Sequence, residues 1–186
     1  VTTPWTRAHG LSKKEATQPG VMADDARSMV QELAYLIHTR VDVMPVVRFM
    51  QRHVAPDAWT KECDVALQRT YRYIKGSAEY GVNCVYVKDD TLSLELWSDA
   101  DMAGDKDTRK STAGGIMLLT GENGTRAMLG ALCKLEPAIS TSSAESETMA
   151  HVMGMKKLTL PMLVVIGNMI TNVKSMIDAE ACIKAI

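Results

Sequence analysis

The segment LSLELWSDAD, residues 92–101, most constrains how this chain can fold. Its leucines fall on every second position from Leu92 to Leu96, which is the pattern of a strand with one buried face. The same strand then reaches two carboxylates, Asp99 and Asp101, where a longer strand would bury more apolar side chains. Gly104, a charged loop and a new apolar run, GIMLL, follow. The pattern predicts a strand that ends at an acidic site.

Two further acids stand at comparable places. Ser142 and Glu145 form a capping-box pattern that predicts a helix from about residue 143, and Glu147 lies in its early turns. Asp178 follows a short segment, residues 173–177, that predicts another strand. Carboxylates on three elements far apart in sequence are the hard oxygen ligands that divalent cations prefer. The sequence therefore indicates a candidate metal site.

The first part of the chain is predicted to be helical. Residues 1–23 contain prolines and glycines without an apolar period, which favours a linker. Apolar side chains at helical spacing predict helices over 26–39 and 43–53, and a third from Pro56 to Lys75. We interpret residues 24–79 as one helical segment.

The second part, residues 80–186, alternates strand and helix signals. Strands are predicted over 82–87 and 92–99, joined by a hairpin turn at 88–90, and then over 115–121 and 125–134. The helix from about 143, the strand over 173–177 and a short helix after Asp178 complete an α/β fold. The apolar run 158–170, interrupted by Pro161 and Gly167, is too short to span a bilayer, so we expect one kinked buried helix or two shorter helices.

Charge and cysteine content narrow the class of protein. The formal net charge is −1, but residues 27–76 hold 8 Lys and Arg against 5 acids, whereas residues 77–186 hold 10 against 14. A basic helical segment before an acidic domain fits a nucleic-acid groove beside a metal site, and ordinary solvated faces fit equally well. Four scattered cysteines without a C-x-x-C pair indicate reduced thiols in an intracellular protein, cytoplasmic or nuclear. A chain that starts at Val1 is expected to be a processed or excised piece.

Several motifs resemble copia-type retrotransposon polyproteins, in that family's order and spacing. SDADMAGDKDTRKSTAGG at 98–115 resembles the family's ribonuclease H segment, SDADWAGDxxDRKSTSGY, and SSAESETMAH at 142–151 resembles its SSTEAEYMAL. KSMIDAEACIKAI at 174–186 resembles its strand that ends in an aspartate. LAYLIHTRVDV at 33–43 and YRYIKGSAEYGV at 71–82 resemble the connection that precedes the ribonuclease H domain.

The resemblance implies a ribonuclease H-like mixed sheet with flanking helices, preceded by a helical connection. It implies hydrolysis of the RNA strand of an RNA–DNA hybrid with Mg²⁺ or Mn²⁺, as part of a reverse transcriptase polyprotein and beside its polymerase portion. Asp99, Glu147 and Asp178 match the family's catalytic, metal-binding acids, and Asp101 is a secondary ligand candidate. Phosphate contacts would come from the loop residues Lys106, Arg109 and Lys110.

Other interpretations of these residues stay open. Taken alone, Asp99 fits a strand-terminating turn, Asp178 fits a helix N-cap, and His151 fits a surface or core histidine. The family's fourth acid lies well beyond the third, and the chain as given ends eight residues after Asp178. The alternative function is therefore a degenerate or domesticated, non-catalytic fragment that serves as a structural or interaction subunit of a larger assembly.

Overall fold

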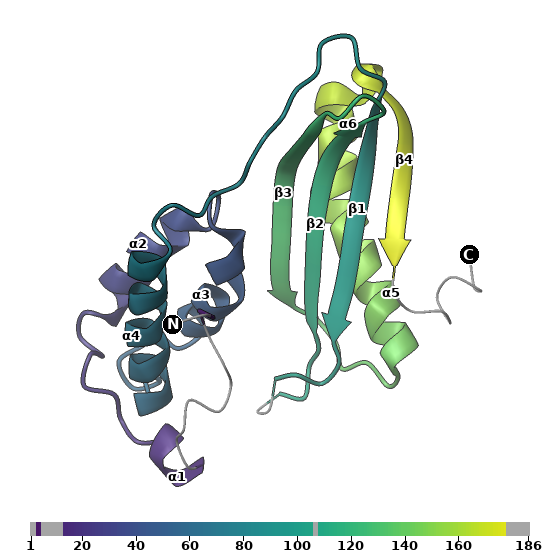
Figure 1. Cartoon of the computed structure of the whole chain (residues 1–186). Coiled ribbons are helices and arrows are strands. Elements are labelled where there is room, and N and C mark those ends of the chain that lie inside the picture. Colours follow the sequence, from purple (N-terminus) through teal and green to yellow (C-terminus); the bar gives the residue numbers. More distant parts are fainter. Residues whose placement is uncertain (1–2, 5–12, 106–107, 178–186) are drawn as a thin grey trace. The chain divides into compact units, whose positions relative to one another are not determined.

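The computed structural model describes residues 3–4, 13–105 and 108–177. The chain divides into two compact units, Val1–Gly81 and Val82–Ile186 (Figure 1). The first unit is helical and the second is a sheet with helices, so the chain is a mixed α/β protein. Each unit is described separately below.

The first unit contains the predicted helices. They are α2 (Ala26–Leu36), α3 (Met44–Gln51) and α4 (Lys61–Gly76), preceded by the short α1 (Lys13–Ala16). A 3₁₀ turn, Val41–Val43, leads into α3. The third helix begins at Lys61 rather than at the predicted Pro56, since residues 56–58 form a turn before it.

The core of this unit lies between α2, α3 and α4. Each helix places a stripe of apolar side chains on its inner face, as the helical spacing predicts. The stripes meet and leave the following side chains almost fully buried: Ala26, Val30, Leu33, Val46, Val47, Met50, Cys63, Ala66 and Leu67.

Residues before α2 are tied to α4, although the sequence favours a linker there. Buried Asp64 accepts hydrogen bonds from the backbone N–H groups of Val21 and Met22, at 2.7 and 3.2 Å, and from the Trp59 indole at 2.7 Å. Three N–H donors satisfy a carboxylate that has left water. A Cβ on Gly20 would stand 2.5 Å from the Trp59 ring, so only glycine fits here.

The second unit is built on a four-stranded sheet with the order β3-β2-β1-β4. Its strands are β1 (Leu92–Asp101), β2 (Thr112–Gly121), β3 (Arg126–Leu135) and β4 (Ile170–Ile177). Neighbours β1 and β2, and β2 and β3, are antiparallel, whereas β4 runs parallel to β1. The predicted strands 92–99, 115–121, 125–134 and 173–177 are all confirmed.

The strand predicted over 82–87 and its hairpin with 92–99 are wrong. Among these residues only Val85 forms an isolated bridge, with Arg126 at the start of β3, and the Val87 N–H donates to the Thr125 hydroxyl. Strand β1 has β2 on one side and β4 on the other, so neither edge is free for a hairpin partner. The alternating pattern of residues 82–87 cannot show that β4, which is distant in sequence, pairs with β1 instead.

Helix α5 (Ser143–Gly154) begins where the sequence predicts and covers one face of the sheet (Figure 1). It continues through a π-helical turn, Met155–Thr159, into α6 (Leu160–Ile166) and a 3₁₀ turn, Gly167–Met169. Pro161, which has no backbone N–H to donate, follows the π-helical turn closely.

The expectation that residues 158–170 form a buried helix is wrong. Val164 and Val165 are 88 and 76% exposed, and Leu160 and Met169 are also exposed. Because α5 and α6 are joined, the helix Ser143–Met169 is long and apolar enough to cross a membrane by length and composition, and within the described parts of the chain it alone meets that test. Its first half packs on the sheet, as core helices of soluble folds also do.

Candidate functional site

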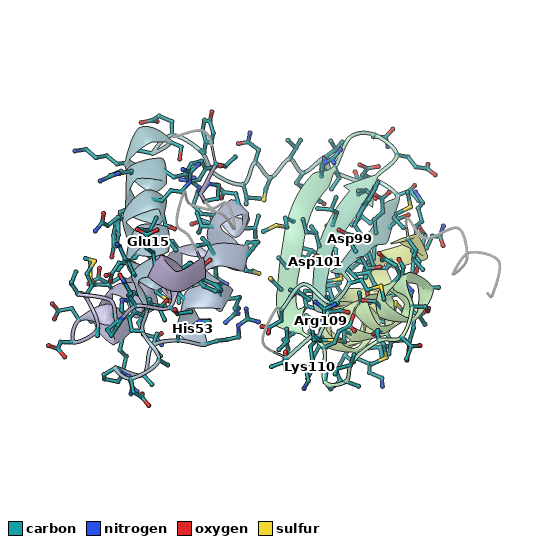
Figure 2. All side chains as sticks on the ribbon, turned by 90° about the horizontal axis from the view of Figure 1, so that it is seen from below. Glu15, His53, Asp99, Asp101, Arg109 and Lys110 are labelled. Carbon is teal, nitrogen blue, oxygen red and sulfur yellow. The ribbon has the colours of Figure 1, made fainter. Side chains whose placement is uncertain are left out.

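The acidic end of β1 places its side chains on two faces of the sheet. Leu94, Leu96 and Ser98 are buried on the face that carries α5, and Asp99 and Asp101 are exposed. Successive residues of a strand point to opposite faces, so Asp99 points away from α5. Figure 2 marks both acids along the sheet. Gly114 of β2 lies directly opposite Asp99 and leaves the cross-strand position beside it unfilled.

Glu147 lies on the face of α5 that packs against the sheet. It is 8% exposed and belongs to a buried stripe with Ser146, Ala150 and Gly154. A Cβ on Gly154 would stand 3.0 Å from the Leu96 side chain, so helix and strand are in close contact. The small residues of this helix face therefore allow its close approach to the sheet.

Hydrogen bonds fix the start of α5. The Ser142 hydroxyl accepts from the Glu145 N–H at 3.2 Å, as the capping-box pattern predicts. The Glu145 carboxylate reaches back to the N–H and hydroxyl of Thr141, both at 2.7 Å, and these bonds lower its pKa. Glu145 therefore has a structural task, which leaves Glu147 as the candidate for chemistry.

A polar contact joins α5 to the end of β1. The Ser98 hydroxyl and His151 Nδ1 lie 3.2 Å apart, and burial lowers the pKa of His151. The sequence interpretation of His151 as a surface or core histidine misses this contact. Its signal in the sequence is its place one helical turn after Glu147, on the same face.

Strand β4 reaches the same end of the sheet as β1, because the two strands are parallel. Its last residue, Ile177, pairs with Ser98, the residue before Asp99. Asp178 follows Ile177 and lies outside the described residues. The described ranges contain no group of three His, Cys, Asp or Glu side chains placed to hold a metal ion. Convergence of Asp99, Glu147 and Asp178 therefore stays a prediction.

The basic residues after β1 differ in their surroundings. Lys106 lies outside the described residues. Arg109 is exposed and has a positive φ of 59°, and its N–H donates to the Asp105 carbonyl. The Lys110 ammonium donates to the Pro137 carbonyl at 2.8 Å, so it ties the loop to the segment after β3. Figure 2 shows Arg109 and Lys110 beyond the acids of β1.

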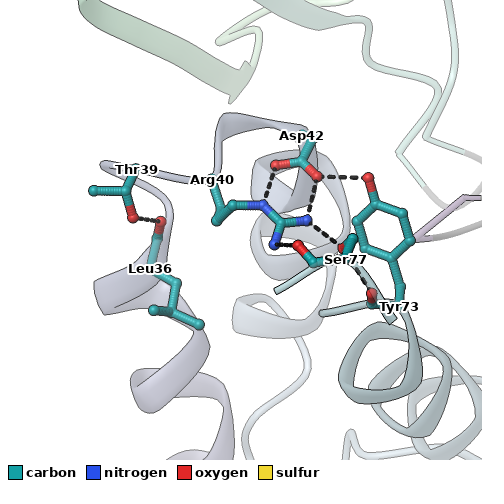
Figure 3. A network of polar contacts seen from close by, with 6 residues as sticks. All are labelled: Leu36, Thr39, Arg40, Asp42, Tyr73 and Ser77. Atoms are coloured by element: carbon teal, nitrogen blue, oxygen red, sulfur yellow. Dashed lines mark hydrogen bonds and ion pairs between the residues drawn. The ribbon is translucent and has the colours of Figure 1, made fainter. Parts of the chain in front are cut away.

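A second polar cluster lies in the helical unit (Figure 3). Arg40, 6% exposed, donates to both Asp42 carboxylate oxygens at 3.0 and 2.8 Å, and to the carbonyl and hydroxyl of Ser77. The Tyr73 hydroxyl donates to Asp42 at 2.7 Å. Burial by itself raises the pKa of Asp42, but the hydrogen bonds from Arg40 and Tyr73 outweigh it and hold the pKa below its ordinary value. All donors here have partners within the chain, so the cluster is structural.

Comparison with known proteins shows which proteins the chain is similar to. It is 37% identical over 121 residues to the retrovirus-related Pol polyprotein from transposon RE1 of Arabidopsis thaliana, a match that covers 64% of this chain and 8% of that polyprotein. The polyprotein from transposon RE2 of the same plant is 38% identical over 96 residues, which is 50% of this chain and 6% of that protein.

A shorter relative is matched over most of its length. The protein of Plasmopara viticola named secreted RxLR effector protein 161 is 31% identical over 127 residues, 66% of this chain and 81% of that protein. No family model matches the chain, and no solved structure matches it. The chain spans less than a tenth of the two plant polyproteins. The chain is therefore similar, over half to about two thirds of its own length, to a small part of retrovirus-related Pol polyproteins from transposons.

Proposed function

We propose that the sheet unit is a ribonuclease H-like domain that hydrolyses the RNA strand of an RNA–DNA hybrid. The helical unit would be the connection that joins it to the polymerase portion of the polyprotein. Similarity to Pol polyproteins supports an origin beside a reverse transcriptase, and such a substrate places the activity inside the cell, in the cytoplasm or nucleus.

The observation that carries this proposal is the arrangement of the elements that bear the three acids. Parallel strands β1 and β4 end at one edge of the sheet, with Asp99 near the end of β1 and Asp178 next in the chain after β4. Helix α5 packs across β1 and β2 and holds Glu147 in its second turn. In α/β sheets, ligands commonly bind outside the carboxyl ends of the strands.

The donor set fits Mg²⁺ or Mn²⁺ in its chemistry, because all three side chains are carboxylates. Asp99 is exposed beside Gly114, where a solvated cation and a phosphate have access, whereas Glu147 is largely buried. Divalent cations held there would supply activation of a water molecule and stabilisation of the leaving oxygen. The acids would hold the cations in place, with Asp101 as an outer ligand candidate.

The substrate would be recognised by its shape and charge. Proteins read RNA-containing duplexes largely through phosphates and 2′-hydroxyl groups rather than base sequence. Exposed Arg109 is the side chain best placed for a phosphate, and Lys106 is a further candidate. Lys110 would have to exchange its bond to the Pro137 carbonyl for a phosphate contact.

Cleavage of a labelled RNA–DNA hybrid by the 186-residue chain tests this proposal. We expect slow cleavage of the RNA strand, faster with Mn²⁺ than with Mg²⁺, because Mg²⁺ demands a nearly ideal octahedral site. Asp99→Asn and Glu147→Gln should each lower the rate by at least about a hundredfold, because cation positioning supplies most of the catalysis.

The matched control is Glu122→Gln, which changes an exposed acid in the turn between β2 and β3. It should cleave at the wild-type rate. Cleavage that survives Asp99→Asn and Glu147→Gln would come from a contaminating nuclease and would contradict the assignment. Folded protein that leaves the hybrid intact with either metal would contradict the catalytic proposal itself.

One observation favours a second candidate, a non-catalytic interaction subunit. Apolar side chains are exposed on α6 and β4, among them Val164, Val165, Val173 and Met176. On the face opposite α5, the cross-strand pair Trp97 and Ile116 is also exposed. The Plasmopara viticola relative, named as a secreted effector, is matched over 81% of its length, so this region also occurs in a protein not named as a polyprotein.

The catalytic and the interaction candidates predict different effects of charged substitutions on the exposed surface of α6. Val164→Lys with Val165→Glu should leave cleavage unchanged if the chain is an enzyme that works alone. The same double variant should abolish recovery of a tagged chain in a stable complex if the apolar surface binds a subunit. A tagged chain that elutes as a monomer from its host extract would contradict the interaction candidate.

A further inference from the structure

The long helix of the sheet unit exposes one continuous stripe from its π-helical turn onward. Pairs of exposed residues recur every four positions along it, which is the spacing of a single helix face. We use the name α6 stripe for six of these residues: Lys156, Lys157, Leu160, Val164, Val165 and Met169. The stripe therefore begins with two lysines and continues with apolar side chains.

A π-helical turn lies at the point where the helix leaves the sheet. The last two buried residues of α5, Ala150 and Gly154, are four residues apart, whereas the next buried residue, Thr159, follows five residues later. A π turn adds one residue to a helical turn, so the side chains after it are rotated about the helix axis. Leu158 still contacts the sheet beside Gly130, but no residue of α6 is fully buried.

The charge of this region has one sign. Residues 148–177 contain no Asp or Glu, although residues 77–186 hold more acids than bases. Among their three lysines, Lys174 is paired with Glu95 of β1 at 3.5 Å, whereas Lys156 and Lys157 are exposed at the start of the α6 stripe. An apolar surface with cations at one end suits an anionic partner that has an apolar interior.

The residue types favour a lipid surface over a protein partner. Protein interfaces usually centre on Trp, Tyr or Arg side chains, and residues 148–177 contain none of these. Helices that lie in a membrane interface combine an apolar face with lysines that reach anionic headgroups. The stripe is too short to cross a bilayer, since Lys156 to Met169 span only about 20 Å and α5 before them packs on the sheet.

We propose that the α6 stripe binds the surface of a membrane that contains anionic lipids. Leu160, Val164 and Val165 enter the boundary between headgroups and acyl chains, and Lys156 and Lys157 contact the anionic headgroups. This inference is independent of hybrid cleavage, because it uses none of the candidate catalytic acids. It places a lipid on the surface where the interaction candidate requires a protein subunit.

Sedimentation with sucrose-loaded vesicles tests this inference on the full 186-residue chain. Vesicles of phosphatidylcholine alone are compared with vesicles that contain about one third phosphatidylserine, whose surface is negative. We expect the chain to bind the anionic vesicles at least about tenfold more strongly than the neutral ones. Added salt should weaken this binding, because it screens the attraction between exposed charges.

Two double variants separate the apolar and the charged contributions. Val164→Asn with Val165→Asn removes apolar surface without altering net charge, and it should lower the affinity for anionic vesicles at least about tenfold. Lys156→Glu with Lys157→Glu should also lower this affinity at least about tenfold. Lys156→Arg with Lys157→Arg should keep it within about threefold of wild type, because the charge is kept.

The matched controls change the same residue types outside the α6 stripe. Val21→Asn replaces an exposed valine of the helical unit. Lys75→Glu with Lys88→Glu makes the same change in net charge at two other exposed lysines. Both controls should bind anionic vesicles as the wild type does, and circular dichroism checks that every variant is folded.

The outcomes decide between a lipid and other occupants. Binding that is lost in both stripe variants and kept in both controls supports the lipid surface. Folded wild-type chain that stays in the supernatant with anionic vesicles overturns the inference, as does binding that falls equally in the stripe variants and the controls. A chain that binds no vesicles, but forms a dimer or a protein complex that Val164→Asn with Val165→Asn dissociates, assigns the stripe to a protein and also overturns it.

Discussion

In the helical unit, a few polar residues connect the ends of the helices by hydrogen bonds. Arg40 lies after α2, Asp42 lies before α3, and Tyr73 and Ser77 lie at the end of α4 (Figure 3). The Arg40 guanidinium contacts all of them and also lies 5.3 Å from the centre of the Tyr73 ring. A planar cation with several donors suits such a junction better than a lysine does.

Removal of the Asp42 charge should destabilise the helical unit. Asp42→Asn leaves the Arg40 charge buried with only Ser77 as a strong acceptor. Breaking a buried ion pair costs about 3–5 kcal/mol, and we expect about 2–3 kcal/mol here because Asp42 is partly exposed. Chemical denaturation followed by circular dichroism measures the change in free energy of unfolding.

The control is Arg48→Ala, which removes an exposed hydrogen bond to Gln51 on α3. Exposed pairs contribute little, so its free energy of unfolding should change by less than about 0.5 kcal/mol. Equal effects of Asp42→Asn and Arg48→Ala would show that the Arg40 cluster does not stabilise the fold.

At the scale of elements, the seating of α5 on the sheet matters most. Its buried stripe consists of small or polar side chains, and Gly154 is the point of closest approach to Leu96. On the same helix, His151 lies within hydrogen-bond distance of Ser98 near the end of β1. The later part of the helix lacks such a stripe, and its valines stay exposed.

Substitution at Gly154 should therefore separate helix from strand. Gly154→Val inserts a branched side chain where even a Cβ would stand 3.0 Å from Leu96, and we expect a loss of about 1–3 kcal/mol in stability. Thermal unfolding measures the effect.

Gly167 offers the matched control, because a Cβ there meets nothing within 4 Å and its φ of −55° suits any residue. Gly167→Ala should raise stability by about 0.4–1 kcal/mol, since alanine restricts the unfolded chain. A Gly154→Val variant as stable as Gly167→Ala would contradict the close packing of α5 on β1.

For the whole molecule, the division at Gly81 predicts two parts that fold separately. The helical unit contains most of the fully buried apolar side chains, whereas the sheet unit buries few and exposes many on α6 and β4. Expressed alone, residues 1–81 should unfold cooperatively and stay monomeric. Residues 82–186 should fold but associate, because large exposed apolar patches promote contact between molecules.

Circular dichroism melting and size-exclusion chromatography of the two fragments check this expectation. The full chain serves as the reference, and its melting curve should contain both transitions. A helical fragment without a cooperative transition would show that its core depends on the sheet unit. A sheet fragment that stays monomeric at high concentration would show that its exposed apolar residues do not cause association.

The sequence by itself determined the local elements. Apolar spacing identified α2, α3 and four strands, and the pair Ser142 and Glu145 located the start of α5 within a residue. These features depend on side chains that are near one another in the chain, so the spacing of apolar residues in the sequence predicts them. The mixed α/β class follows from the order of such elements.

Only the tertiary structure decided which elements meet. Strand β4 lies 69 residues after the end of β1 and takes the edge that residues 82–87 were predicted to occupy. Three other features also depend on contacts between distant segments. They are the exposure of Val164, the separate faces of Asp99 and Glu147, and the contact of Ser98 with His151. Local patterns state which face of an element is apolar, but the partner of that face depends on the free energy of the whole packed unit.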